Sequence, residues 1–132
     1  QSAGSDIIFD FDQSLSLEGD SGPYLQYALV RAASIILAAG DKEVGETPVE
    51  PFDIERLITR FPEIAARAER ERAPHHVAQY LTQLAGEWNS FYAKERIIDG
   101  EYEAYKLRLA KAFVATMRNG LALLGIPVPE RM

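Results

Sequence analysis

Two tyrosines and an arginine lie at helical spacing near the start of the sequence. Tyr24, Tyr27 and Arg31 fall three and four residues apart within GDSGPYLQYALVR, residues 19–31. Side chains at this spacing share one face of a helix. A stripe of aromatic rings beside a cation can stack unpaired bases and hold a phosphate. The same stripe can equally be half-buried packing with its hydroxyls in water, because aromatic residues at helical spacing commonly belong to a core.

Two further residues raise the same pair of alternatives. Asn89 and Tyr92 lie three residues apart in a second helical stretch, so they also share a face. Tyr102 and Tyr105 have the same spacing, and we expect them to form a packing pair at the start of the last helix. Periodicity alone leaves the role of Asn89 and Tyr92 open.

Patterns that would support catalysis or a metal site are scarce. The sequence has no Gly-rich phosphate loop followed by Lys, and no Gly-x-Ser-x-Gly. His75 and His76 are its only histidines and it has no cysteine. A metal needs three or four convergent ligands, whereas adjacent helical residues point about 100° apart. We therefore predict no catalytic residue and no metal ligand, and interpret the acidic pair Asp10 and Asp12 as solvated charges.

The charge balance limits how nucleic acid could be bound. The formal net charge is -6, the wrong sign for a protein that holds RNA by phosphate attraction alone. The alternating charges of AERERA, residues 68–73, are typical of a solvated helix face with internal ion pairs. RNA binding would therefore have to rest on local cations and on stacking.

The chain length indicates one domain. A chain of 132 residues can bury a hydrophobic core without disulfides. It shows no signal peptide and no apolar run of the roughly 20 residues that cross a bilayer, so no membrane partner is expected. Residues 1–5, QSAGS, are expected to be an added leader or the cut end of a longer chain. Residues 6–132 are expected to form the domain.

The pattern predicts an all-α fold, a bundle of about five helices with mostly antiparallel neighbours. Only residues 6–12, DIIFDFD, alternate in a strand-like way. Residues 40–51 carry glycines, prolines and charges without period and predict a surface loop. The predicted helices cover about residues 21–39, 53–60, 62–72, 75–96 and 101–124.

Caps and apolar stripes support these boundaries. Ser21 and Asp53 are predicted N-caps, and Gly40 and Gly125 are predicted helix ends. The positions predicted to be buried recur at spacings of three and four and are Leu25, Ala28, Ala32, Ile35, Ala39, Ile54, Leu57, Ile58, Ile64, Ala65, Ala68, Val77, Leu81, Leu84, Trp88, Phe91, Leu109, Ala110, Phe113, Met117, Leu121 and Leu124.

Three separated motifs resemble one family. EGDSGPYLQYALVRAASIIL, residues 18–37, resembles the segment that opens the C-terminal helical domain of arginyl-tRNA synthetases, in which Gly-[Asn/Asp]-[Thr/Ser]-Gly-Pro-Tyr-x-Gln-Tyr-Ala-x-x-Arg introduces the anticodon-binding bundle called the DALR domain. PHHVAQYLTQLAGEWNSFY, residues 74–92, is similar to a later helix of that bundle. GLALLGIPVPERM, residues 120–132, resembles the family's ending, which closes with Pro-Glu-Arg-Met. The resemblance covers residues 6–132.

The resemblance implies a function that spacing does not show. The parent enzyme would activate arginine with ATP and Mg, and transfer it to the 3′ end of tRNA(Arg). This domain would bind the anticodon loop, would have the parent's catalytic domain as a further partner, and would be cytoplasmic. Four side chains face the loop by family similarity: Tyr24, Arg31, Tyr92 and Met132. Three more are proposed from position alone: Tyr27, Asn89 and Arg131.

The sequence also departs from the family pattern. The catalytic signatures of the HIGH and KMSKS types are absent from these residues, so we predict a non-catalytic unit without a cofactor of its own. Trp88 stands where the family usually has phenylalanine, which changes core volume and not chemistry. DALR bundles also occur in cysteinyl- and some glycyl-tRNA synthetases, but the Gly-Pro-Tyr-Leu-Gln-Tyr motif and the Arg-Met ending favour the arginine enzyme.

A helical protein-interaction or structural bundle without RNA binding is the alternative. That role predicts an exposed apolar patch of several hundred Å² on the bundle. RNA binding predicts a basic and aromatic patch beside the C-terminus instead.

Overall fold

The fold is a bundle of α-helices. A computed structural model describes residues 21–42 and 44–128. These contain α2 (Ser21–Ala39), α3 (Asp53–Ile58), α4 (Phe61–Glu71), α5 (His75–Lys94) and α6 (Glu103–Leu123), and no strand. The predicted all-α class is thereby confirmed. The strand-like stretch at residues 6–12 and the leader at residues 1–5 lie outside the described residues.

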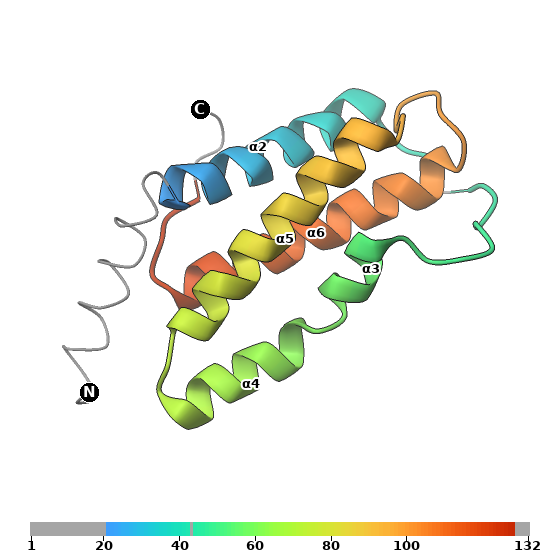
Figure 1. Cartoon of the computed structure of the whole chain (residues 1–132). Coiled ribbons are helices and arrows are strands. Elements are labelled where there is room, and N and C mark those ends of the chain that lie inside the picture. The colour runs from blue at the N-terminus through green and yellow to red at the C-terminus, as the bar shows by residue number, and fades with distance from the viewer. Residues whose placement is uncertain (1–20, 43, 129–132) are drawn as a thin grey trace.

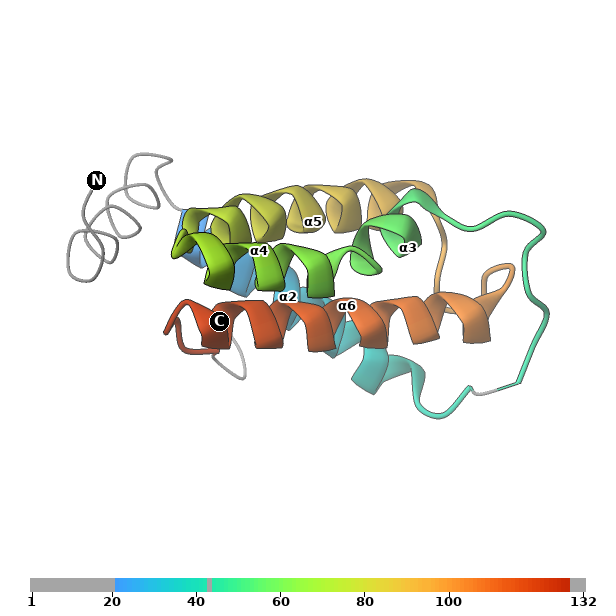
Figure 2. The same ribbon diagram turned by 90° about the horizontal axis from the view of Figure 1, so that it is seen from below.

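α5 is the central helix, because it contacts each of the other four. Figure 1 shows α2 and α6 alongside α5, with α3 and α4 following one another along its other flank. Seen from below, α6 forms the opposite layer from α4 and α5 (Figure 2). The long loop after α2 crosses the end of the bundle, so that α3 starts at the end where α2 finishes.

Two neighbouring long helices, α2 and α5, are parallel (Figure 1). α6 runs against both α2 and α5, but α2 and α5 run in the same direction (Figure 1). The prediction of mostly antiparallel neighbours holds for α2 with α6 and for α5 with α3, α4 and α6, and the pair of α2 and α5 is an exception to it (Figure 1). The physical reason is that α3 and α4 carry the chain back along the bundle before α5 begins.

The core is built around two stacked rings. Trp88 and Phe113 lie with ring centroids 4.9 Å apart and planes 12° from parallel. Leu81 of α5 packs against Gly120 of α6 so closely that a Cβ there would lie 2.6 Å from Leu81 Cδ2. Most of the apolar residues that the sequence predicts to be buried are buried in the structure. Six of the predicted positions are only partly buried: Ile35, Ala39, Ile58, Ile64, Ala65 and Leu124.

Several helix ends differ from the predictions. Asp53 does not cap α3, because Phe52 occupies the N-cap position with no side-chain hydrogen bond and Asp53 is already helical. Gly40 and Gly125 have φ of 70° and 72°, the left-handed conformation that the predicted ends require. α5 ends at Lys94, two residues before the predicted Arg96.

Tyr105 of the predicted tyrosine pair has partners that the sequence did not indicate. Tyr105 packs on Phe52 with ring centroids 6.3 Å apart, and its hydroxyl donates a hydrogen bond to the carboxylate of Glu55. Tyr102 has a φ of 57° at the start of α6. Tyr102 therefore precedes the regular part of α6 and does not share its helical backbone conformation with Tyr105.

Candidate nucleic-acid interface

Two side-chain pairs join α2 and α5 across their parallel contact. Near the start of α2, Asn89 Nδ2 donates a hydrogen bond of 3.0 Å to the hydroxyl of Tyr24. Two turns later, the guanidinium carbon of Arg31 lies 4.1 Å from the ring centre of Tyr92. Tyr24 and Arg31 share a face of α2, and Asn89 and Tyr92 share a face of α5, so four predicted residues meet on one surface.

This surface is partly open to solvent. The exposed fractions are 39% for Tyr24, 56% for Tyr27 and 37% for Tyr92. The tyrosines are therefore neither core residues nor free side chains: each has one part packed and another available for contact. We call Tyr24, Tyr27, Arg31, Asn89 and Tyr92 the α2/α5 patch.

A stack of buried rings supports the patch from below. Trp88 lies with its ring 6.1 Å from that of Tyr92, in a stacked arrangement, and packs in turn on Phe113. Stacked and edge-on aromatic pairs add about 0.5–1.5 kcal/mol each beyond their buried area. Trp88 is fully buried and its Nε1 finds no hydrogen-bond partner among the described residues. A phenylalanine there would leave no such group, so tryptophan changes hydrogen bonding as well as volume.

The chain beyond α6 returns to the first turns of α2. Gln26 Nε2 donates a hydrogen bond of 2.8 Å to the carbonyl of Pro127, and the Ile126 amide donates to the carbonyl of Leu121. Gln26 is two residues from Tyr24, so the tail reaches the same part of α2 on a different side of the helix. Arg131 and Met132 lie outside the described residues.

Sequence reasoning missed Gln26 as an anchor. Its signal was present in the Tyr-x-Gln-Tyr motif, because a glutamine between two tyrosines at helical spacing faces away from both of them. Such a residue is free to hold a neighbouring segment. Here that segment is the start of the tail that carries two of the predicted contacts.

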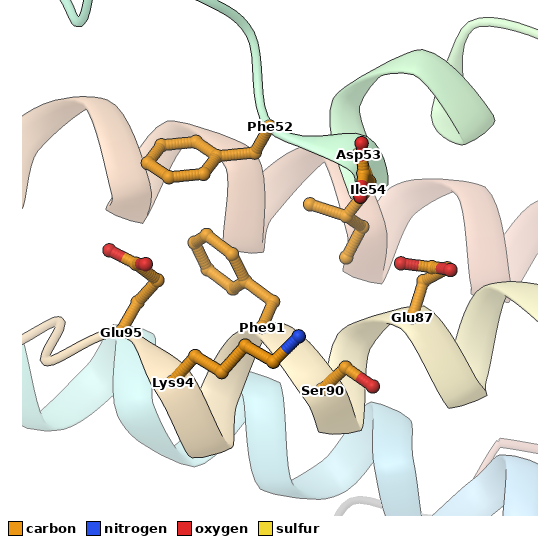
Figure 3. A pocket seen from close by; sticks show the side chains of 8 residues that line it. All are labelled: Phe52, Asp53, Ile54, Glu87, Ser90, Phe91, Lys94 and Glu95. Atoms are coloured by element: carbon orange, nitrogen blue, oxygen red, sulfur yellow. The ribbon is translucent and has the colours of Figure 1, made fainter.

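A hollow between α3 and α5 is the wrong kind of site for a phosphate. Figure 3 shows Asp53, Glu87 and Glu95 around it, with Lys94 as its only basic residue. Phe52 and Phe91 meet edge to face at 5.2 Å on one side of it. Three carboxylates against one ammonium repel an anion, and we assign no RNA contact to this hollow.

A third surface lies between α2 and α6. Its groove is lined by Ala33, Ile36, Leu37, Val114, Ala115, Lys111 and Arg118. Leu37 is 84% exposed there. The apolar character of this groove is the kind of feature that the protein-interaction alternative requires.

The histidines occupy an ordinary helix junction. His76 Nε2 lies 3.0 Å from the Glu71 carboxylate. Hydrogen bonds from Arg67 and His76 lower the pKa of Glu71. No group of three or more residues of the metal-ligating types His, Cys, Asp and Glu comes together within residues 21–42 and 44–128. In that same part of the chain, no helix is both long and apolar enough to span a membrane.

Comparison with known proteins identifies the class. The DALR anticodon binding domain family matches residues 25–132, and the chain belongs to this family. It is 39% identical over 137 residues to the arginine–tRNA ligase of Vibrio campbellii, an alignment that spans 97% of this chain and 24% of that protein. It is 41% identical over 134 residues to the arginine–tRNA ligase of Halobacterium salinarum, which covers 96% of this chain and 21% of that one.

A solved structure agrees with the sequence relatives. Thermus thermophilus arginyl-tRNA synthetase superposes with a TM-score of 0.74 at 36% identity, over 92% of this chain and 23% of that one. The chain thus spans about a quarter of the length of the relatives that it matches. It corresponds to the anticodon-binding region of arginyl-tRNA synthetases.

Proposed function

We propose that the α2/α5 patch binds the anticodon loop of tRNA(Arg). The observation that carries this proposal is the meeting of two partly exposed tyrosines and one arginine from separate helices on one surface. The proposal extends to a parent protein that joins arginine to tRNA(Arg) with ATP and Mg. In it, the rest of the chain would supply the catalytic domain, and this domain would position the tRNA.

The patch offers two kinds of contact. The Tyr24 and Tyr27 rings have open surface on which unstacked bases can lie, at about 1–3 kcal/mol per stacked base. The Tyr92 ring carries Arg31 over one face, so a base there meets the guanidinium plane instead of the phenol. Guanidinium planes stack on bases as aromatic rings do, and they add charge.

The tail would complete the site. It is anchored to α2 through Gln26 and Pro127, on a different side of the helix from Tyr24, and five residues follow before the end of the sequence. Arg131 and Met132 would contact a loop nucleotide, in part through backbone groups. Removal of Met132 should therefore weaken tRNA recognition and leave the helices intact.

The net charge of -6 indicates how strongly the isolated domain should bind RNA. Phosphate attraction is weak for an acidic domain, so stacking supplies most of the affinity, and the isolated domain binds weakly. Most of the free energy for holding a whole tRNA would come from the rest of the parent protein.

A titration of an RNA hairpin tests the proposal. The chain is added to a fluorescent hairpin with a seven-nucleotide loop of tRNA(Arg) sequence, and to the same stem as a blunt duplex. We expect preference for the loop, and Tyr24→Ala should weaken loop binding by about 1–3 kcal/mol. Leu37→Ala, on the same helix but in the α2/α6 groove, should bind as the unaltered chain does. Equal binding to hairpin and duplex would contradict the proposal.

The α2/α6 groove favours a second candidate function. Its apolar lining and the exposed Leu37 suit a protein partner. If Leu37→Ala and not Tyr24→Ala altered the function of the parent protein, the interaction role would replace RNA binding.

A further inference from the structure

A groove opens beside Tyr92 where α5 ends. Its volume is about 480 Å³, within the range of sites that hold small organic groups. It is lined by Ile35 of α2, by Tyr92 and Ala93 of α5, and by Glu95, Arg96, Ile97 and Ile98 of the following loop. Because Tyr92 belongs to both, the groove continues the α2/α5 patch.

The loop that walls this groove is held in place by a buried lysine. Lys106 of α6 is 3% exposed, and its Nζ donates a hydrogen bond of 3.1 Å to the carbonyl of Arg96. The same Nζ lies 3.0 Å from the carboxylate of Glu95. Ile97 is buried beneath the loop. These contacts explain why α5 stops at Lys94, and they give the groove a preformed wall.

The charges of the groove suit an RNA strand. Glu95 is its only acidic lining residue, and Lys106 pairs with that carboxylate. Arg96 lines the groove, and its Nε donates a hydrogen bond of 3.2 Å to the Ile98 carbonyl, which directs the side chain along the rim. Arg31 lies one helical turn from Ile35 on α2. Two guanidinium groups therefore border an apolar floor.

We propose that this groove receives a second unstacked nucleotide, adjacent in the RNA to the one on the α2/α5 patch. The base would rest on Ile35, Ile98 and the edge of Tyr92, and its phosphate would face Arg96. This inference rests on the proposed function, because only a loop strand already on the patch would lead into the groove. Apolar contact gives affinity there without reading base identity.

The test compares groove and control variants on hairpins with missing bases. Hairpins carrying one abasic site at each loop position are titrated with the unaltered chain, with Ile98→Asp and with Val49→Asp. Val49 is 98% exposed on the loop after α2 and adds the same charge elsewhere. Arg96→Gln serves as a second groove variant that removes the positive charge and keeps a polar side chain. Circular dichroism and Trp88 fluorescence check that each variant folds.

For the unaltered chain, an abasic site at either of two loop positions should weaken hairpin binding. We expect Ile98→Asp to lose about fivefold or more in affinity against Val49→Asp, and to become insensitive to one of the two abasic sites. Arg96→Gln should weaken hairpin binding, and the same two abasic sites should still lower its affinity. If the unaltered chain prefers the hairpin and Tyr24→Ala weakens it, but Ile98→Asp matches Val49→Asp, the groove inference is overturned alone. No preference for the hairpin would overturn the proposed function and this inference together.

Discussion

The guanidinium of Arg31 lies over the ring of Tyr92, 4.1 Å from its centre, and so links α2 to α5 at the surface of the bundle. Exposed cation–π contacts of this kind are worth about 0.5–1 kcal/mol. The contact keeps the arginine from sampling many rotamers. A nucleotide that arrives at the patch therefore meets a cation already in place.

The first prediction concerns the charge of Arg31. If Arg31 faces a phosphate, Arg31→Met should weaken hairpin binding, and the slope of log affinity against log salt should fall by about 1. Arg31→Lys should keep the salt slope but lose part of the affinity, because an ammonium has no plane on which a base can stack. Fluorescence anisotropy at several salt concentrations measures both quantities.

Lys111 provides the matched control for this experiment. It is an exposed cation of α6 in the α2/α6 groove, away from the patch. Lys111→Met removes the same formal charge, and its salt slope should stay at that of the unaltered chain. An equal fall in slope for Lys111→Met and Arg31→Met would show that only net charge matters.

The second prediction concerns the contact between α5 and α6. In Gly120→Ala the new Cβ would lie 2.6 Å from Leu81 Cδ2 and 3.0 Å from Leu81 Cγ, and Leu81 is fully buried. Overpacking of this kind costs about 1–3 kcal/mol of unfolding free energy, which urea denaturation measures. Gly22→Ala is the control, because its Cβ would meet nothing within 4 Å. Equal stability of the two variants would mean that the helices can separate slightly at no cost.

The third prediction concerns alkaline pH. Burial raises the pKa of Tyr80 to about 12, and its hydroxyl donates a hydrogen bond of 2.7 Å to the Leu57 carbonyl. Burial, with Glu55 beside it, likewise raises the pKa of Tyr105 to about 12. The folded state therefore holds these protons more tightly than the unfolded state does. Their contribution to stability is complete below pH 10 and is lost progressively from there towards pH 12.

Two measurements check the alkaline behaviour. Absorbance of tyrosinate should show late ionisation of Tyr80 and Tyr105, and the thermal stability should fall above pH 10. In Tyr80→Phe one late ionisation should disappear, and about 0.5–1.5 kcal/mol of stability should be lost at neutral pH with the hydrogen bond. Ionisation of all six tyrosines together near pH 10 in a folded protein would contradict the burial of Tyr80.

The sequence predicted the helices well and their mutual arrangement less well. Apolar periodicity depends on local geometry, so the stripes around Leu81 and Phe113 could be read directly. The parallel direction of α2 and α5 follows from the path through α3 and α4, which no local pattern encodes. The early end of α5 depends on Lys106, twelve residues beyond Lys94, and helical propensity does not report such a contact.

The candidate site was partly predictable for the same reason. Tyr24 and Arg31 share a helix face, and so do Asn89 and Tyr92, and spacing shows both relations. That the two faces pack against each other depends on the tertiary structure, which spacing within one helix does not show. The groove beside Tyr92 could not be predicted, because Arg96 was expected to be the last residue of a helix, whereas it lies in the loop that lines the groove.

A chemical-shift titration tests the central claim, that the α2/α5 patch is the RNA-binding surface. The ¹⁵N-labelled chain is titrated with the anticodon hairpin, and the shifted amide and side-chain signals are placed on the structure. We predict that the largest shifts occur at Tyr24, Tyr27, Arg31, Asn89 and Tyr92, with the Asn89 side-chain amide among them because it donates to Tyr24. Shifts gathered around Leu37 and Val114, with the patch unchanged, would contradict the account.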